Sequence, residues 1–162
     1  TFKVSSRGLM GFRSSFLSLT SGEGLMSFAS AGFGPRISGD LGSRQNGVLI
    51  SNTDGKAVGY ALFNLQARGR LFVEPGDLIY EGMVVGLHSR SNDLTVNPAK
   101  EKKLTNVRAS GSDEAIDLNA PVKMSLEQSL EFIDEDEFVE VTPSAVRIRK
   151  KLLKEYERKR VN

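Results

Sequence analysis

The hydrophobic positions of residues 1–37 follow a strand period, then a helix period, then a strand period again. Phe2 and Val4 fall on one face of an extended segment over residues 1–5. From Leu9 to Leu19 apolar side chains recur at roughly helical spacing, and Gly22 follows as a residue that can end a helix. Residues 24–33 alternate again, before Gly34-Pro35. The pattern predicts strand–helix–strand.

Polar and Gly-rich residues 38–46 predict a linker, after which short apolar runs are separated by Gly and Pro. We expect strands at 47–51, 56–64, 70–73, 78–80 and 83–88. Asp54-Gly55 favours a hairpin between the first two, because Gly accepts a positive φ without steric cost. Short strands with such regular turns are typical of a small barrel or a curled antiparallel sheet.

The C-terminal part predicts a capped helix, two strands and a basic helix. Ser125 and Gln128 have the spacing of a capping box, which opens an acidic helix that ends near Asp136. Residues 138–141 and 146–149 alternate as strands, with Arg147 and Arg149 on a wet face. Residues 152–160 predict a short terminal helix. The fold class is α+β, a mostly antiparallel, barrel-like β domain with one or two short helices and a long loop.

Charge is arranged in blocks, although the net charge is only +2. Lys123 is the one base from residue 113 to residue 140, whereas Glu155 and Glu157 are the only acids from residue 147 to residue 160. Such blocks suggest an RNA-facing side and a solvated side, or simply two soluble faces. The acidic run 134–137 lacks the ligand spacing of a calcium loop and is predicted to be the solvated end of a helix.

Catalytic and metal chemistry finds little support in the sequence. The chain has no Cys and one His, His88, and it lacks a phosphate-binding loop. A hydrolase that uses His88 with Ser89, Ser91 or Asp93 is the weakest interpretation, because nothing predicts a triad geometry. We expect no catalytic residue, no metal, no cofactor and no small-molecule substrate.

The chain has neither a signal peptide nor an apolar run long enough to span a bilayer, so we expect a cytoplasmic protein without a membrane partner. It begins without Met, which suggests the inside of a longer protein.

The polar segment 88–108 is the strongest candidate for function. Lys and Arg in it suit phosphates, while Asn, Ser and Thr suit sugars and base edges. It contains no aromatic residue, which argues against a platform for stacking single strands and favours structured RNA recognised by its shape. The bland alternative is a mobile surface loop.

Nine stretches, in order over nearly the whole chain, carry a family resemblance. They are Arg7-Gly-Leu-Met-Gly-Phe-Arg13, Arg44-Gln-Asn-Gly-Val-Leu-Ile50, Gly55-Lys56-Ala57, Arg68-Gly69, Tyr80-Glu-Gly-Met-Val-Val-Gly86, His88-Ser-Arg-Ser-Asn-Asp-Leu-Thr-Val-Asn97, Lys103-Leu-Thr-Asn-Val-Arg-Ala-Ser110, Asp113-Glu114 and Phe138-Val-Glu-Val-Thr-Pro143. Together they resemble the C-terminal part of the ribosome-associated translational GTPases of the TypA/BipA family.

The resemblance implies that residues 1–37 are the second half of a ferredoxin-like domain, similar to domain V of elongation factor G. Residues 38–162 would be the C-terminal domain of the TypA/BipA type. GTP and Mg²⁺ would belong to a domain that this chain does not contain. The ligands would be the ribosome, ribosomal RNA and transfer RNA, with the 88–108 loop near the acceptor end of the A-site transfer RNA and the peptidyl transferase centre. The family is implicated in ribosome assembly and in stress adaptation.

The same resemblance assigns candidate RNA-binding residues. From the 88–108 loop they are His88, Arg90, Asn92, Asn97, Lys100, Lys102, Lys103, Asn106 and Arg108. Arg44 and Arg68 lie in matched turns, where they would contact phosphates or hold the domain together. The alternative function is a protein-interaction module that docks through the acidic helix 125–137 on a basic partner.

Overall fold

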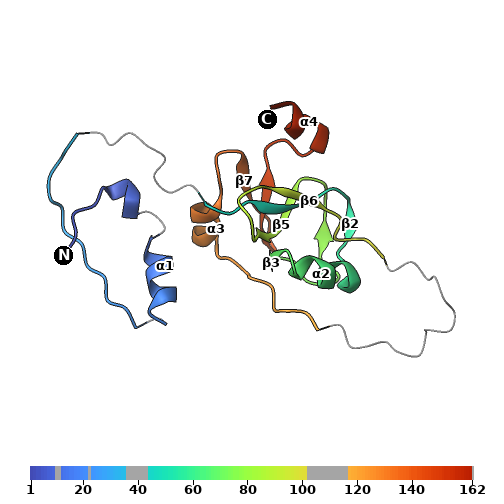
Figure 1. Ribbon diagram of the computed structural model, residues 1–162, viewed down its shortest axis with the longest axis horizontal. Helices are drawn as coiled ribbons and strands as arrows, with labels where there is room; N and C mark the ends of the chain where they lie inside the picture. The colour runs from blue at the N-terminus through green and yellow to red at the C-terminus, as the bar shows by residue number, and fades with distance from the viewer. Residues whose placement is uncertain (10–11, 22, 36–43, 102–116, 162) are drawn as a thin grey trace.

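Strand β5 (Met83–His88) lies at the centre of a six-stranded sheet in this computed structural model, which describes residues 1–9, 12–21, 23–35, 44–101 and 117–161 (Figure 1). Almost all of its residues are buried, as expected of an apolar run with neighbours on both edges. Strand β1 (Val48–Ser51) pairs antiparallel with one edge of β5, and β6 (Leu94–Val96) pairs parallel with β1.

The other edge of β5 is shared by two strands. β3 (Gly69–Leu71) pairs with its C-terminal half and β8 (Val146–Lys150) with its N-terminal half, and β7 (Glu137–Val141) then pairs antiparallel with β8. A second small sheet joins β2 (Gly55–Lys56) to β4 (Leu78–Ile79). The predicted α+β class with mostly antiparallel strands is confirmed, and among the described residues the large sheet is open rather than closed into a barrel.

Each face of the large sheet carries its own hydrophobic core. On one face the fully buried Leu49 and Val85 pack with Leu62 and Leu65 of helix α2 (Gly59–Gln66). The opposite core is built from Val48, Ile50, Val84 and Ile148, against which Phe72, Met124, Phe132 and Ile133 pack. Truncation of a side chain as deeply buried as Leu49 to Ala typically costs about 2–5 kcal/mol.

Helix α2 corrects the strand predicted over residues 56–64. Local signals do not favour this helix, since Tyr60 and Phe63 are residue types typical of strands and Val58, which precedes the helix, provides no side-chain cap. Burial of Ala61, Leu62 and Leu65 on the sheet nevertheless favours the helix, because these positions share one helical face. The predicted hairpin at Asp54-Gly55 is also wrong, since β2 pairs with β4 and not with β1.

In residues 1–35 the predicted helix is confirmed as α1 (Phe12–Leu19), which follows a short 3-10 helix, η1 (Ser6–Leu9). The strands predicted at 1–5 and 24–33 do not form in the described structure. A strand needs a neighbour for its backbone groups, and neither segment has one among the described residues. Phe2, Leu25, Phe28 and Phe33 are consequently between 72% and 111% exposed.

The capping box opens helix α3 (Leu126–Phe132) as predicted. Ser125 Oγ accepts from Gln128 N at 3.2 Å, and Ser125 N donates to Gln128 Oε1 at 2.9 Å. The helix ends four residues earlier than expected, because Asp134 N donates to Glu137 at 3.0 Å and the chain turns into β7. Helix α4 (Glu155–Val161) confirms the predicted terminal basic helix.

Candidate RNA-binding surface

The segment that follows β5 is held in place by buried contacts at its base. His88 is 5% exposed, and its Nδ1 lies 2.6 Å from the Asn92 carbonyl oxygen, which can only accept, so Nδ1 carries the hydrogen. Gly47 N donates to Arg90 O at 2.8 Å, and Val48 N donates to Asp93 Oδ1 at 2.8 Å. His88 therefore positions the segment from a buried site, and its contact with RNA stays a prediction.

Gly47 allows the close approach of the two segments. A Cβ at this position would lie 2.2 Å from the carbonyl carbon and oxygen of Asn92, which no side chain tolerates. Gly47 is part of a stretch that carries the family resemblance, and the structure explains why glycine is needed there, because residue 92 packs against the start of β1.

Arg90, Asn92, Asn97 and Lys100 are exposed on this fixed segment. Asn97 Oδ1 accepts from Ala99 N at 3.0 Å and so stabilises the turn that presents Lys100. The buried Pro98 accepts from Val58 N at 2.9 Å through its carbonyl, which ties the turn to the start of α2. These hydrogen bonds hold residues 88–101 against β1 and the start of α2.

Lys102, Lys103, Asn106 and Arg108 lie outside the described residues.

Arg68 and Arg70 add two exposed cations beside the same segment. Ser89 N donates to Arg68 O at 2.9 Å, and Arg70 pairs with Leu87 in the β3–β5 ladder. Arg70 was not among the predicted residues. Its signal was available, because a charged residue at the start of the predicted strand 70–73 is expected to face solvent or a ligand.

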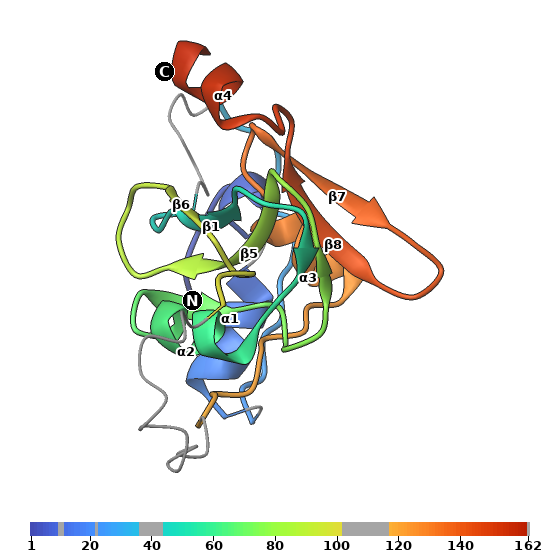
Figure 2. The ribbon, with the colours of Figure 1, turned by 90° about the vertical axis from the view of Figure 1, so that its right-hand side faces the viewer.

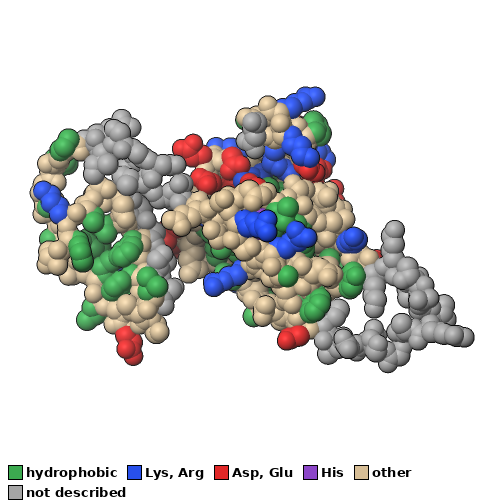
Figure 3. Space-filling view, viewed as in Figure 1, with side chains coloured by type: hydrophobic (Ala, Val, Ile, Leu, Met, Phe, Trp, Pro, Cys, Tyr) green, Lys and Arg blue, Asp and Glu red, His purple; other side chains and the backbone are tan. Residues whose placement is uncertain are grey.

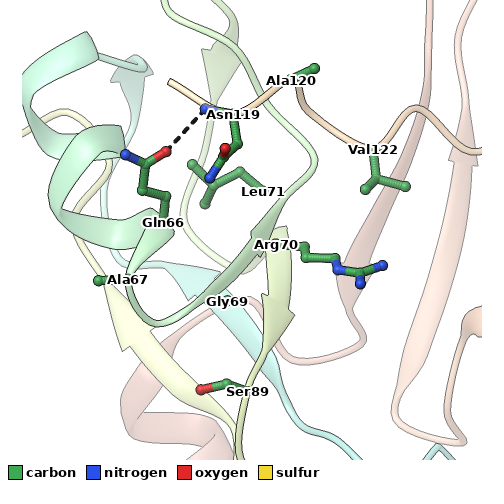
Figure 4. Close-up of a pocket in the computed structure, with 9 residues that line it drawn as sticks. All are labelled: Gln66, Ala67, Gly69, Arg70, Leu71, Ser89, Asn119, Ala120 and Val122. Carbon is green, nitrogen blue, oxygen red and sulfur yellow. Dashed lines mark hydrogen bonds between the residues drawn. The ribbon is translucent and has the colours of Figure 1, made fainter. Parts of the chain in front are cut away.

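A hollow of about 480 Å³ opens beside Arg70 (Figure 4). Its lining joins Gln66 at the end of α2, Ser89 at the end of β5, and Asn119 and Val122 of the segment that precedes α3. Gln66 Oε1 accepts from Asn119 N at 3.1 Å, as Figure 4 shows, and Val122 N donates to Leu71 O at 2.8 Å. A guanidinium, a hydroxyl and two amides around one concavity suit phosphate, ribose and base edges.

The side chain of Arg44, a predicted RNA contact, forms its contacts inside the domain. Its guanidinium donates to both carboxylate oxygens of Glu137 at 2.8 Å and lies 4.6 Å from the centroid of the Phe132 ring. Lys150 Nζ lies 3.0 Å from Glu137, 2.8 Å from Asp136 and 2.6 Å from Asp93. Arg44 was expected either to contact phosphates or to hold the domain together, and its contacts support the second role.

This ionic cluster also corrects the interpretation of the acidic run 134–137 as a solvated helix end. The Glu137 side chain is fully buried and that of Lys150 is 3% exposed. Burial acts to raise the pKa of Glu137, but the hydrogen bonds from Arg44 and from Asp134 N, with the charge of Lys150, lower it below its usual value. Burial likewise opposes the charge of Lys150, but Asp136 and Asp93 raise its pKa, so the cluster stays ionised at neutral pH.

The acidic helix of the alternative function is solvent-facing along α3. Glu127 is exposed, Asp134 is half-buried, and Leu126 and Leu130 are 39% and 56% exposed. Within the described ranges no group of His, Asp and Glu residues has the arrangement of a metal site. A helix long and apolar enough to cross a membrane is likewise absent from the part of the chain that the structure describes.

Figure 3 shows Lys and Arg side chains spread over the face of the sheet domain and gathered at α4. The family model of the TypA/BipA C-terminal domain matches residues 46–155.

Named relatives agree with this match. The large ribosomal subunit assembly factor BipA of Haemophilus influenzae is 58% identical over 159 residues, which are 98% of this chain and 26% of that protein. The Salmonella typhimurium protein of the same name is 58% identical over 161 residues, and that of Buchnera aphidicola is 55% identical over 161 residues, each over 99% of this chain and 26% of the relative. The chain thus spans about a quarter of the length of the curated relatives it matches. It belongs to the family of the TypA/BipA C-terminal domain.

Proposed function

We propose that this chain binds the ribosome, as the RNA-contacting C-terminal part of a translational GTPase that acts in assembly of the large subunit. The observation that carries the proposal is the polar surface at the C-terminal end of β5, where Arg68, Arg70 and Arg90 are exposed on backbone held by buried contacts, together with the exposed Lys100 in the turn after β6. Cations held on fixed backbone bind phosphates without first having to be ordered. The relatives are named for large ribosomal subunit assembly, which supports the same partner.

The finer contacts belong to the same proposal. Asn92 and Asn97 stand beside the cations and supply donors and acceptors for ribose hydroxyls and base edges of ribosomal RNA. Continuation of the segment through Lys102, Lys103, Asn106 and Arg108 would reach the acceptor end of transfer RNA in the A site. Stress-adapted translation, a cytoplasmic location, and GTP and Mg²⁺ bound outside this chain complete the proposal. The chain itself then contributes binding rather than catalysis.

The test is co-sedimentation of the chain with large ribosomal subunits over a series of KCl concentrations. Arg90→Gln with Lys100→Gln, and separately Arg68→Gln with Arg70→Gln, should weaken binding and lower the slope of log affinity against log salt by about one per lost phosphate contact. Lys3→Gln with Lys123→Gln removes the same charge from exposed positions elsewhere and is the matched control.

A triple neutral variant at Lys102, Lys103 and Arg108 extends the test to the rest of the 88–108 loop. Binding by all the basic variants that matches the control at every salt concentration would overturn the proposal. The protein-interaction alternative predicts the opposite pattern. Reversal of charge at Glu127, Glu131 and Asp134 would then abolish binding while the basic variants do little.

A further inference from the structure

The outer face of the β7–β8 hairpin is left without a covering helix. Arg149 pairs with Met83 of β5 and with Phe138 of β7, so these three side chains point to the same side of the sheet. Met83 lies in the core beneath α2, but the hairpin extends away from that helix (Figure 2). Phe138, on the edge strand β7, is therefore 45% exposed.

Two cations flank this aromatic ring. Arg149 Cζ lies 5.2 Å and Lys151 Nζ 5.1 Å from the centroid of the Phe138 ring, both within the range of a cation–π contact. Arg147 pairs with Glu140 one ladder step further along the same face. Alternate residues on a strand lie about 6.7 Å apart, so Arg147, Arg149 and Lys151 form a row of positive charges.

Glu140, the acid on this face, already has a hydrogen-bond donor in Tyr80. Glu140 accepts a hydrogen bond from the Tyr80 hydroxyl, and burial together with this bond raises the pKa of Tyr80, which keeps the hydroxyl a donor. None of Arg147, Arg149 and Lys151 forms an ion pair with any described residue. Three cations against the one carboxylate of Glu140 leave this face net positive around an exposed ring, which is the surface that a polyanion with planar groups fits.

Helix α4 continues the basic surface beyond β8. Arg158 donates to Leu152 O at 2.9 Å and also to Leu153 O, which fixes the helix against the end of the strand. Arg160 lies 5.8 Å from the centroid of the Tyr156 ring, and this ring is 59% exposed. The pairing of an exposed aromatic with a cation thus recurs next to the hairpin.

We propose that the β7–β8 face is a second RNA site, which takes an unpaired, single-stranded segment of RNA: Phe138 with Arg149 stacks a base, while Arg147 and Lys151 hold the flanking phosphates. The inference rests on the proposed function, because a ribosomal RNA target supplies unpaired bases beside structured helices. The two sites differ in chemistry. The surface after β5 has cations and amides without aromatics, whereas the hairpin adds a stacking ring at the opposite end of β5.

The first test measures binding of the full chain to a fluorescein-labelled, unstructured 12-nucleotide RNA by anisotropy, beside the same sequence as a duplex. Phe138→Leu should weaken binding of the single strand roughly tenfold, the loss of one stacked base, and should change duplex binding much less. Phe138→Trp, which keeps an aromatic ring, should retain the wild-type affinity for the single strand. Phe63→Leu is the matched control, because Phe63 is also 45% exposed but lies on α2.

Arg147→Gln with Arg149→Gln should lower the salt slope for the single strand, and unfolding of each variant in urea verifies that the hairpin still forms. Equal affinities of the Phe138→Leu and Phe63→Leu proteins would overturn the inference. Binding of polyglutamate that equals RNA binding and is insensitive to Phe138→Leu would also overturn it, because the face would then recognise an acidic peptide.

Failure here and failure of the proposed function are distinguishable. If the Phe138 variants leave RNA binding unchanged while the Arg90/Lys100 variant loses ribosome binding, only the second site is wrong. If the wild-type chain binds neither ribosomes nor RNA, both proposals are wrong.

Discussion

Replacement of Glu137 by Gln tests whether the buried ionic cluster holds the domain together. The Glu137 carboxylate is fully buried and accepts two hydrogen bonds from Arg44, both at 2.8 Å, and one from Asp134 N at 3.0 Å. Glutamine keeps the shape of the side chain but removes the charge, and it turns an NH₂ group toward Arg44 or Lys150. The variant therefore leaves two buried cations facing a neutral amide.

The expected cost is about 3 kcal/mol, at the low end of the range for breaking a buried ion pair. The low end applies because Lys150 keeps Asp93 and Asp136, and Arg44 keeps its bonds to the carbonyls of Asn46 at 2.6 Å and Phe132 at 3.2 Å. For a urea m-value of about 2 kcal/mol per molar, this cost moves the midpoint of unfolding down by about 1.5 M.

Urea unfolding followed by far-ultraviolet circular dichroism suits this chain, since it has no Trp. Lys123→Gln is the control, because it breaks an ion pair with Glu74 whose side chains are 69% and 47% exposed, and its midpoint should not move. A triple change of Arg44, Glu137 and Lys150 to Met, Leu and Met should be less destabilising than Glu137→Gln alone, since no buried charge then lacks a partner. A Glu137→Gln midpoint equal to that of the control would refute the reasoning.

Because the pKa of Glu137 is lowered in the folded state, its carboxylate stabilises the fold above the ordinary Glu pKa of 4.5, and this stabilisation is lost as pH falls through the folded-state pKa. The difference in urea midpoint between wild type and Glu137→Gln should therefore shrink below about pH 4.5. Gly47→Ala should displace residues 90–93 and weaken ribosome binding with no change of charge, measured by co-sedimentation, and unchanged binding would show that their placement does not matter. Ser125→Ala should lower the unfolding free energy by about 1 kcal/mol through loss of the α3 cap, whereas Ser144→Ala in the turn after β7 should not. Gly82→Ala should unfold the chain at lower urea than any of these surface changes, because Gly82 has φ of 87° and a Cβ would lie 2.6 Å from Leu153 Cα.

Most of the sheet was predictable because it is encoded locally. The runs that became β1, β3, β4, β5, β7 and β8 are short, apolar or alternating, and bounded by turn residues, and the boundaries agree within one or two residues. The α3 cap was predictable for the same reason, since Ser125 and Gln128 bond to each other across one turn. The pairing of strands far apart in sequence, such as β5 with β8, was not predictable from the pattern.

The errors share a cause in contacts between distant segments. Helix α2 forms in place of the predicted strand 56–64, despite the strand propensity of Tyr60 and Phe63, because its buried residues pack on the sheet. Glu137 and Lys150 fall inside charge runs that the sequence presents as solvated, but Glu137 pairs both with Lys150 and with Arg44, which is 93 residues away in the sequence. The sequence indicated Arg90 and Lys100 as candidate contacts and both are exposed, but it could not show that His88 is buried or that Arg70 pairs with Leu87 of β5.

The position of β8 inside the sheet sets the moment at which a growing chain can finish folding. Met83 pairs with Arg149 and Val84 pairs with Ile148. This part of the β5 edge therefore stays unpaired until residues 146–150 have left the ribosomal exit tunnel. Until then Glu137 also lacks Lys150, and an unpaired strand edge is available to neighbouring chains. A premature stop codon before residue 146 would therefore yield an aggregation-prone chain rather than a smaller working domain.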